Sequence, residues 1–459
     1  MTDRTSIHGQ WSSRLAFILA ATGSAVGLGN IWKFPYITGE NGGGAFVLVY
    51  LVCVVIVGIP IMMAEVLIGR RGRQSPINTM RLLAHEESRH GIWQMVGWSG
   101  MVAGFLIISF YSVIAGWALA YVFRTASGTF TGVTADGVSS IFSSLVSDPE
   151  RLLAWHTIFM VMTTIVVSRG VRSGLEQAVR VLMPLLFMLL LVLVGYAMNT
   201  DKFDEGLAFL FSPNFSALTP GAVLTAMGHA FFTLSLGMGA IMIYGSYLPK
   251  SASIAKTSVV VALMDTLVAL LAGMAIFPIV FVNGLEAGAG PGLIFQTLPL
   301  AFGHMPGGTL FGTLFFVLLV FAAWTSGISL LEPAVAWLVE NQGVNRVRAA
   351  TLMGILGWLF GIVTIMSFSS WAFEFDFAGE TKRSGMFDIL DILTANIMLP
   401  LGGLAMAVFA GWFMSRDSTM DELGMGDSLV FKGWFFLVRY VTPVAVIVVF
   451  LQLLGVIDF

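Results

Sequence analysis

Long apolar runs, separated by short polar segments, follow one another along most of the chain. A helix needs roughly 20 apolar residues to cross a bilayer, and eleven runs reach about that length. The pattern therefore predicts an all-α polytopic membrane protein with eleven transmembrane helices. A further apolar segment, 291–304, is short and rich in Pro and Gly, so we expect a re-entrant or surface helix there. The expected spans are about 11–37, 43–69, 91–124, 153–169, 176–199, 219–248, 255–283, 308–340, 347–370, 387–413 and 433–456.

The composition agrees with this pattern. The chain of 459 residues is 57% hydrophobic and only 11% charged, which excludes a soluble domain. Most of its 23 Lys and Arg residues lie in the N-terminal segment and in the loops on the same side of the predicted spans. By the positive-inside rule, we expect a multi-pass protein of the cell inner (plasma) membrane with a cytoplasmic N-terminus.

Two of the predicted spans are interrupted by residues that weaken helices. The first span contains ATGSAVGLGNIWKFPY at 21–36, and the sixth contains FFTLSLGMG at 231–239. A broken membrane helix frees carbonyl and N–H groups that can bind ions and anionic substrate groups. The alternative is that Gly27-Leu28-Gly29 is only a face for close helix packing.

The two breaks lie five spans apart, which suggests two repeats of five helices. Because five is odd, the repeats have opposite topology, which is the plan of many secondary transporters, with the binding site at the midplane. We expect one integral membrane domain made of a first repeat at 1–200, a second repeat at 201–413 and an additional helix at 414–459.

Several motifs in order along the whole chain resemble the neurotransmitter:sodium symporter family. They are AVGLGNIWKFPY, NGGGAF at 41–46, GIPIMMAE at 58–65, FFTLSLGMGA at 231–240 and TSGISLLEP at 325–333. The likeness is greatest to the bacterial branch that carries hydrophobic amino acids. It implies a five-plus-five inverted-repeat fold with helices 1 and 6 interrupted.

The resemblance also implies two sodium sites. Sodium prefers the hard oxygen ligands that a broken helix offers. For Thr325 and Ser326 the alternative is that each hydroxyl bonds its own helix backbone. The first site would take backbone oxygens of Gly23, Val26 and Ala322 with the hydroxyls of Thr325 and Ser326. The second would take the Ala25 carbonyl with Asn30, Thr233 and Asp265.

A substrate pocket is implied beside the sodium sites. Tyr111 and the N–H groups of Leu28 and Gly29 would hold a carboxylate, and freed carbonyls with Ser235 would face an amine. Amine-carrying relatives have Asp at the position of Ser24, so here the negative charge must come from an amino acid. The implied pocket residues are Ser24, Ala25, Leu28, Gly29, Ile107, Tyr111, Phe232, Thr233, Ser235, Met238, Ser326 and Leu330.

Two gates are implied as well. The outer gate would pair Lys33 with Asp391, or with Asp388 as the alternative, above the lid Phe232. Lys cannot form the bidentate fork of the Arg that relatives carry, so this pair should be loose. The inner gate would contain Trp11, Ser246, Tyr247 and Glu340, with His8 where relatives have Arg and with Arg4 and Arg14 as candidate replacements.

Three further residues have implied roles with alternatives. Glu65 would accept N–H groups freed by the helix breaks, a structural role, or else relay protons. Gly174 and Pro184 would unwind the start of the fifth span and open a sodium exit, or else mark a loop end and a tolerated kink.

Together these expectations describe a sodium-coupled symporter of neutral hydrophobic L-amino acids, working by alternating access. Because Asp265 supplies a fixed carboxylate where chloride-dependent relatives carry Asn, we expect chloride independence, with a proton as a candidate for the return step. The alternative is a sodium-dependent receptor or channel on the same scaffold. The chain contains no nucleophile–base pair, phosphate-binding Gly-Lys-Ser/Thr loop or basic tail, so we expect no enzyme activity, ATP or nucleic acid. The expected partners are the amino acid, sodium and the lipid bilayer.

Overall fold

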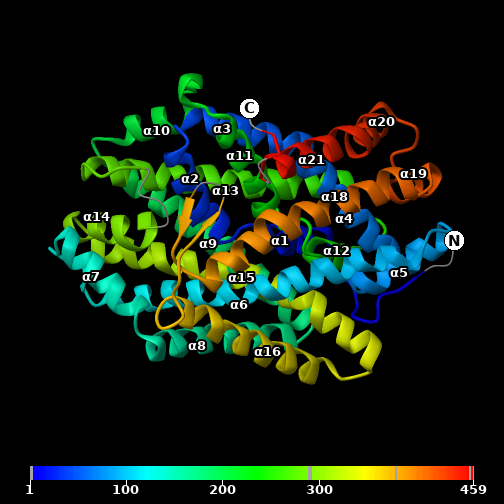
Figure 1. Cartoon of the computed structure of the whole chain (residues 1–459), viewed down its shortest axis with the longest axis horizontal. Coiled ribbons are helices and arrows are strands. Elements are labelled where there is room, and N and C mark those ends of the chain that lie inside the picture. Colours follow the sequence, from blue (N-terminus) through cyan, green and yellow to red (C-terminus); the bar gives the residue numbers. More distant parts are fainter. Residues whose placement is uncertain (1–3, 288–291, 378–379, 454–455, 458–459) are drawn as a thin grey trace.

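The protein is a bundle of helices, most of which run along the long axis of the molecule (Figure 1). The computed structural model describes residues 4–287, 292–377, 380–453 and 456–457. The helices are α1 (Arg14–Ala25), α2 (Phe34–Glu40), α3 (Gly44–Cys53), α4 (Ile59–Gly72), α5 (Pro76–Glu86), α6 (Gln94–Ala126), α7 (Ala135–Val146), α8 (Pro149–Ser168), α9 (Gln177–Ala197), α10 (Phe203–Phe211), α11 (Pro220–Thr233), α12 (Ala240–Ser246), α13 (Ile254–Val282), α14 (Leu298–His304), α15 (Gly308–Gln342), α16 (Arg346–Ser367), α17 (Met386–Asp391), α18 (Leu399–Val408), α19 (Arg416–Leu423), α20 (Leu429–Phe436) and α21 (Thr442–Leu453).

Shorter elements join or extend these helices. A small antiparallel hairpin pairs β1 (Phe375–Phe377) with β2 (Glu380–Lys382). Turns of 3-10 helix lie at Gly91–Trp93 and Phe215–Ala217. Stretches of wider π-helix lie at Gly29–Lys33, Val54–Gly58, Val171–Glu176, Leu293–Thr297, Ile392–Met398, Phe409–Phe413 and Leu437–Val441.

The all-helical membrane fold is confirmed. Within the described ranges, nine helical stretches are long and apolar enough to cross a membrane. The bent pair Arg14–Ala25 and Gly29–Glu40 adds a tenth. The eleventh expected crossing falls on α11 and α12, which are too short to span singly and are separated by residues 234–239. The count of eleven therefore depends on taking that pair as one span, and it stays a prediction.

The first interruption is a sharp change of direction. α1 ends at Ala25, the following residue Val26 has an extended backbone (φ −68°, ψ 106°), and the chain re-enters a helix at Gly29. The two halves meet at 51°. Because the chain is extended between them, several backbone groups of this segment have no partner within a helix.

The second interruption contains a run of left-handed residues. Ser235, Gly237 and Gly239 have φ of 55°, 82° and 77°. A non-glycine residue at positive φ is uncommon, so Ser235 is held there by its surroundings. At Gly237, a Cβ would come within 2.1 Å of the Leu399 carbonyl oxygen, so only glycine fits. Both breaks therefore lie where the sequence predicted them.

The interior is built around two long helices. α15, with 35 residues, packs along α6, with 33 residues, and α1 and α9 also pack against α15. The segment expected as a re-entrant or surface helix is helical from Leu293 to His304, and it buries Phe295 and Leu298 against this interior. Pro291 lies outside the described residues.

The second break gives a test of the fold. We expect Gly237→Ala to destabilise the protein by about 3 kcal/mol, because left-handed strain of roughly 1–2 kcal/mol adds to the clash with α18. The thermal unfolding temperature of the purified protein in detergent measures the change. Gly433→Ala is the matched control, since a Cβ there meets no atom within 4 Å and should change stability by less than about 1 kcal/mol. Equal unfolding temperatures for both variants would contradict the assigned backbone.

Candidate transport site between the two helix breaks

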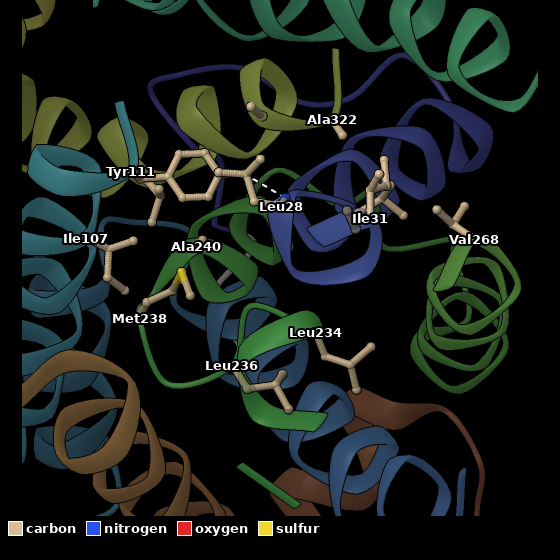
Figure 2. Close-up of a cluster of buried hydrophobic side chains, with 14 of the residues drawn as sticks. Leu28, Ile31, Ile107, Tyr111, Leu234, Leu236, Met238, Ala240, Val268 and Ala322 are labelled. Carbon is tan, nitrogen blue, oxygen red and sulfur yellow. Dashed lines mark hydrogen bonds between the residues drawn. The ribbon is translucent and has the colours of Figure 1, made fainter. Parts of the chain in front are cut away.

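A cavity lies where the two breaks face α6 and α15. Four of its lining residues, Leu28, Tyr111, Ile107 and Met238, are drawn in Figure 2. Every predicted pocket residue except Thr233 lines the cavity, and Gly27 and Ser329 are additions that the sequence interpretation missed. The lining residues are Ser24, Ala25, Gly27, Leu28, Gly29, Ile107, Tyr111, Phe232, Ser235, Met238, Ser326, Ser329 and Leu330.

Side-chain hydroxyl groups form hydrogen bonds with backbone groups of the first break. The Tyr111 hydroxyl accepts a hydrogen bond from the Leu28 N–H at 3.2 Å. Ser235 donates to the Ser24 carbonyl at 2.8 Å, and Ser326 approaches the same carbonyl at 3.1 Å. The cavity thus has an end with an N–H and a phenol, and an end with a carbonyl oxygen. This polarity matches a ligand that carries both a carboxylate and an ammonium group.

Gly27 lets the first break approach its neighbours closely. A Cβ at this position would lie 2.5 Å from the Ser326 hydroxyl oxygen and 2.8 Å from the Tyr111 hydroxyl oxygen. The sequence had singled out Gly27 only as part of a packing face. The structure shows that this packing also brings the two hydroxyls to the break.

The rest of the cavity wall is apolar. Ile107, Met238 and Leu330 are buried, and at most 5% of the surface of each residue is exposed. Phe232 closes the wall near Lys33, whose ammonium lies 4.8 Å from the ring centroid. A flexible thioether such as that of Met238 can repack around ligands of different size.

Asn30, Thr233 and Asp265 meet behind this wall. The Asn30 amide donates to Asp265 Oδ1 at 2.7 Å, and the Thr233 hydroxyl donates to Asp265 Oδ2 at 3.1 Å. Asp265 is fully buried and has no cationic partner within 4.0 Å among the described residues. A buried carboxylate needs a compensating charge. Its carboxylate, amide and hydroxyl oxygens fit sodium, and Thr233 faces this cluster rather than the cavity.

The residues of the other implied sodium site are also neighbours. The Ser326 hydroxyl reaches from α15 to the Val26 carbonyl at 3.3 Å. The Thr325 hydroxyl instead donates to Ala322 and Phe321 carbonyls of its own helix, at 3.1 and 3.2 Å. Gly23 lies against Thr325, since a Cβ there would come within 3.3 Å of the Thr325 Cβ. The donor set is composed of neutral oxygens, which fit sodium, and the assignment of ligands stays a prediction.

Glu65 lies on α4 beneath the second break. Its Oε1 accepts the N–H of Gly237 at 2.6 Å, and its side chain is fully buried. The carboxylate therefore satisfies a backbone group that the break leaves without a helical partner. The structural role expected for Glu65, as an acceptor for N–H groups freed by the helix breaks, requires this contact.

The implied outer gate is not assembled. In the described part of the chain, Lys33 and Asp391 form no ion pair within 4.0 Å, and Asp388 instead accepts the Ser384 N–H at 2.6 Å. The compact ammonium of Lys33 lies over the Phe232 ring, where it gains a cation–π contact. The role of Lys33 and Asp391 as a gate stays a prediction.

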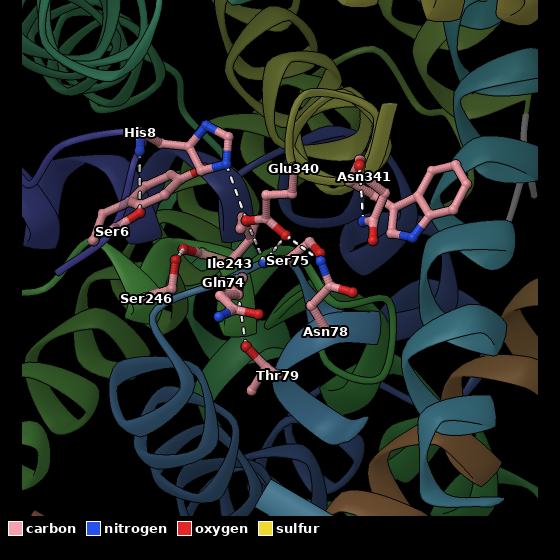
Figure 3. Close-up of polar contacts among 12 residues, drawn as sticks. Ser6, His8, Gln74, Ser75, Asn78, Thr79, Ile243, Ser246, Glu340 and Asn341 are labelled. Carbon is pink, nitrogen blue, oxygen red and sulfur yellow. Dashed lines mark hydrogen bonds and ion pairs between the residues drawn. The ribbon is translucent and has the colours of Figure 1, made fainter. Parts of the chain in front are cut away.

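Glu340 of the implied inner gate lies in a cluster with His8, Ser75 and Asn78 (Figure 3). His8 contacts Glu340 at 3.0 Å between Nε2 and Oε1, so it takes the position that relatives fill with Arg. Glu340 also accepts the Ser75 N–H at 2.8 Å and the Asn78 amide at 2.8 Å. Arg4 pairs with Glu86 instead and is not the substitute. His8 therefore contacts Glu340, and the role of this contact as a gate stays a prediction.

The other implied inner-gate residues bond outside this cluster, and Ser246 donates to the Ile243 carbonyl of its own helix at 2.7 Å. Trp11 donates from its ring nitrogen to the Tyr244 carbonyl at 3.0 Å. Tyr247 donates to Glu332 at 2.7 Å, and Glu332 pairs with Arg346. The sequence signal for this pair was the Glu of TSGISLLEP, which the sequence interpretation quoted but did not use.

The start of the fifth span is wound as a wide helical turn. Val171–Glu176 is π-helical and Pro184 lies inside α9. Glu176 accepts the Ser12 N–H at 3.0 Å, so the N-terminal segment is attached to this turn. Gly174 and Pro184 thus bracket a helix that is wound in this structure.

The fold and the site define a membrane transporter whose binding cavity lies between two broken helices. A family model described as the sodium:neurotransmitter symporter family matches residues 8–134 and 140–458. The chain belongs to this family, which is a family of transporters and not of enzymes. Its use of sodium follows from that membership.

Similar proteins agree with this assignment. The uncharacterized sodium-dependent transporter YhdH of Bacillus subtilis is 39% identical over 453 residues, covering 98% of both chains. An uncharacterized sodium-dependent transporter of Haemophilus influenzae is 34% identical, covering 98% of this chain and 99% of its own length. The crystal structure of MhsT in complex with L-phenylalanine has a TM-score of 0.89 and 43% identity, covering 97% of this chain and 99% of that one.

The inner cluster generates a prediction. Glu340→Ala removes the acceptor shared by His8, Ser75 and Asn78, and hydrogen bonds to a charged group contribute about 1.5–3 kcal/mol each. We expect amide exchange of residues 8–12 to become at least about tenfold faster, measured by hydrogen–deuterium exchange. Glu205→Ala, which removes an exposed carboxylate paired with Lys202, is the control and should leave these amides unchanged. Unaltered protection in Glu340→Ala would show that the cluster does not hold the N-terminal segment.

Proposed function

We propose that this protein is a sodium-coupled symporter of neutral hydrophobic L-amino acids, aliphatic and aromatic. The observation that carries the proposal is the cavity itself, which has no acidic side chain in its lining and lies beside the buried carboxylate of Asp265. An amino acid would bring its own carboxylate to the cavity. The similarity to MhsT, whose structure contains L-phenylalanine, supports this class of substrate.

The substrate would be oriented by its two charged ends. Its carboxylate would lie against the Tyr111 hydroxyl and the N–H groups of Leu28 and Gly29, and its ammonium group against the carbonyl of Ser24 near Ser235. Its side chain would then extend toward Ile107, Met238 and Leu330. Neutral side chains are favoured because this part of the lining offers no charge.

Two sodium ions would couple to this substrate. One would bind the Asp265, Asn30 and Thr233 oxygens with the Ala25 carbonyl, next to the substrate carboxylate. The other would join α1 and α15 through Val26 and Ser326. Because both ions bind oxygens of the first break, their binding favours the arrangement that also binds substrate.

A fixed carboxylate would make transport independent of chloride. Asp265 is fully buried beside the oxygens that would bind sodium, and a sodium ion bound there would keep its carboxylate charged. A relative that carries a neutral residue there needs a mobile anion to balance the ion. No second anion is required when the balancing charge is part of the chain.

Transport would proceed by alternating access in the cell inner membrane, with a cytoplasmic N-terminus. The closed cluster of His8, Glu340 and Ser75 supports a gate on the N-terminal side. The repeats at 1–200 and 201–413 would move relative to one another, with 414–459 as an added helix.

Uptake into proteoliposomes tests this function. With an inward sodium gradient, labelled L-phenylalanine should accumulate above its external concentration, and collapse of the gradient should abolish accumulation. A receptor on the same scaffold would show sodium-dependent binding without accumulation, and a channel would only equilibrate the amino acid. Either result would overturn the proposal.

The apolar wall generates a prediction about substrate size. Met238→Phe should lower the binding affinity for large aromatic ligands such as L-tryptophan by one to two decades, because overfilling a packed site costs about 1–3 kcal/mol. The affinity for L-valine should fall less. Competition binding in sodium measures both, with Met188→Phe on the exposed face of α9 as the control. Equal losses for tryptophan and valine would refute the position of Met238.

The carboxylate of Asp265 generates a prediction about the chloride dependence of uptake. Wild-type uptake should be unchanged when gluconate replaces chloride. Asp265→Asn should lose at least about tenfold in chloride-free uptake, since removing a unit charge near an ion costs about 1–4 kcal/mol. Asp148→Asn, which alters a half-exposed carboxylate at the start of α8, is the control. Normal chloride-free uptake by Asp265→Asn would show that the fixed charge is not needed.

A further inference from the structure

A charged side chain lies inside the last of the apolar helical stretches. Arg439 belongs to the stretch Leu429–Gln452, which is long and apolar enough to cross a membrane. It takes no part in the contacts described for substrate or sodium. A cation in a membrane-spanning segment needs a partner, and one that the known function does not use marks a candidate site. We call Arg439 and the three rings around it, Trp412, Phe435 and Tyr440, the aromatic arginine site.

The three rings hold the guanidinium group in place. Its central carbon lies 4.3 Å from the ring centroid of Trp412, and 5.6 Å from those of Phe435 and Tyr440. The Trp412 ring nitrogen also donates to the Arg439 carbonyl at 2.8 Å. Cation–π contacts of this kind attract the charge and fix the side chain. A ligand would therefore bind it without a large ordering cost.

Within the described ranges, the chain supplies neither a counter-ion nor a hydrogen-bond acceptor to this guanidinium group. No carboxylate of a described residue lies within 4.0 Å of it, and its Nε is buried without an acceptor. Arg416 differs in this respect, because it lies over the Phe431 ring but is paired with Asp427, as is Lys432. The rings attract a cation but do not replace the acceptors that the N–H groups of Arg439 require.

The aromatic arginine site lies level with the end of a neighbouring span. Trp412 is in the last turn of the stretch Met386–Phe413, and the next residue after this stretch, Met414, has an extended backbone. α19 follows, at the same end of the molecule as the N-terminus, which we expect to be cytoplasmic (Figure 1). Exposed aromatic rings such as those of Trp412 and Tyr440 are typical of the membrane–water interface. The guanidinium group is therefore expected at the depth of lipid headgroups.

Two stretches of π-helix meet at this site. They are Phe409–Phe413, which carries Trp412, and Leu437–Val441, which carries Arg439. Gly411 lets them approach closely, since a Cβ there would lie 3.1 Å from the Arg439 Cα. Single wide turns of this kind are frequent at functional sites.

We propose that the aromatic arginine site binds an anionic phospholipid, whose headgroup phosphate accepts hydrogen bonds from the terminal nitrogens of Arg439. The side chain is partly exposed, so a headgroup can reach it. Guanidinium groups match the geometry of phosphate oxygens, and the cytoplasmic leaflet is rich in anionic lipids. The acyl chains would lie along Val444 and Ile447, which are exposed and follow Tyr440 on one face of the helix. Lipid binding does not depend on the proposed transport function.

Native mass spectrometry of the full-length protein in neutral detergent tests this site, with phosphatidylglycerol or phosphatidylcholine of identical acyl chains. We expect wild type to bind the first phosphatidylglycerol at least about tenfold more tightly than phosphatidylcholine, because hydrogen bonds between charged groups are strong. Arg439→Gln removes the charge and should lose this preference. Arg439→Lys keeps the charge but cannot form the paired hydrogen bonds, so it should retain only part of the preference.

Arg416→Gln is the matched control, because Arg416 also lies over an aromatic ring but is already paired with Asp427. It should bind both lipids as wild type does. The soluble compound sn-glycerol 3-phosphate, which has the phosphate but no acyl chains, should not displace the bound lipid. An unchanged preference in Arg439→Gln, an equal loss in Arg416→Gln, or displacement by sn-glycerol 3-phosphate would overturn the proposal. If Arg439→Gln does not fold, Arg439→Lys decides, since wild-type affinity for phosphatidylglycerol in that variant would also overturn it.

Discussion

A backbone group that leaves a helix inside a bilayer must find another partner, and this constraint organises the whole molecule. Two helices break at the same place, so their freed carbonyl and N–H groups gather in one small volume. Side chains from other helices satisfy part of them: Tyr111 from α6, Ser326 from α15 and Glu65 from α4. The groups that point into the cavity have the polarity of an amino acid's two charged ends. The binding site is therefore the consequence of breaking two helices side by side.

A buried charged group is under the same constraint, because it too needs partners. Asp265 is fully buried and receives hydrogen bonds from the neutral groups of Asn30 and Thr233. A carboxylate in that position is stable when a cation joins it, which supports the proposed sodium site there.

Much of the fold and site could be predicted from the sequence, because the deciding signals are local. Glycines, hydroxyls and Pro35 in apolar runs marked both breaks, and family motifs located nearly all of the cavity lining. What could not be predicted depended on side-chain direction. Thr233, expected both in the pocket and beside Asp265, faces Asp265 and does not line the cavity. Lys33 lies over Phe232 rather than beside Asp391. The motif that contains Glu332 did not indicate that its carboxylate accepts the Tyr247 hydroxyl.

The central claim is that sodium and an amino acid bind as one unit at the meeting point of the two breaks. Equilibrium binding of L-phenylalanine to the purified protein at a series of sodium concentrations tests it most directly, together with sodium binding at a series of L-phenylalanine concentrations. Linkage requires each ligand to raise the affinity of the other by the same factor. The account predicts a shared factor of at least about tenfold. Amino-acid affinity that does not change with sodium would contradict the account.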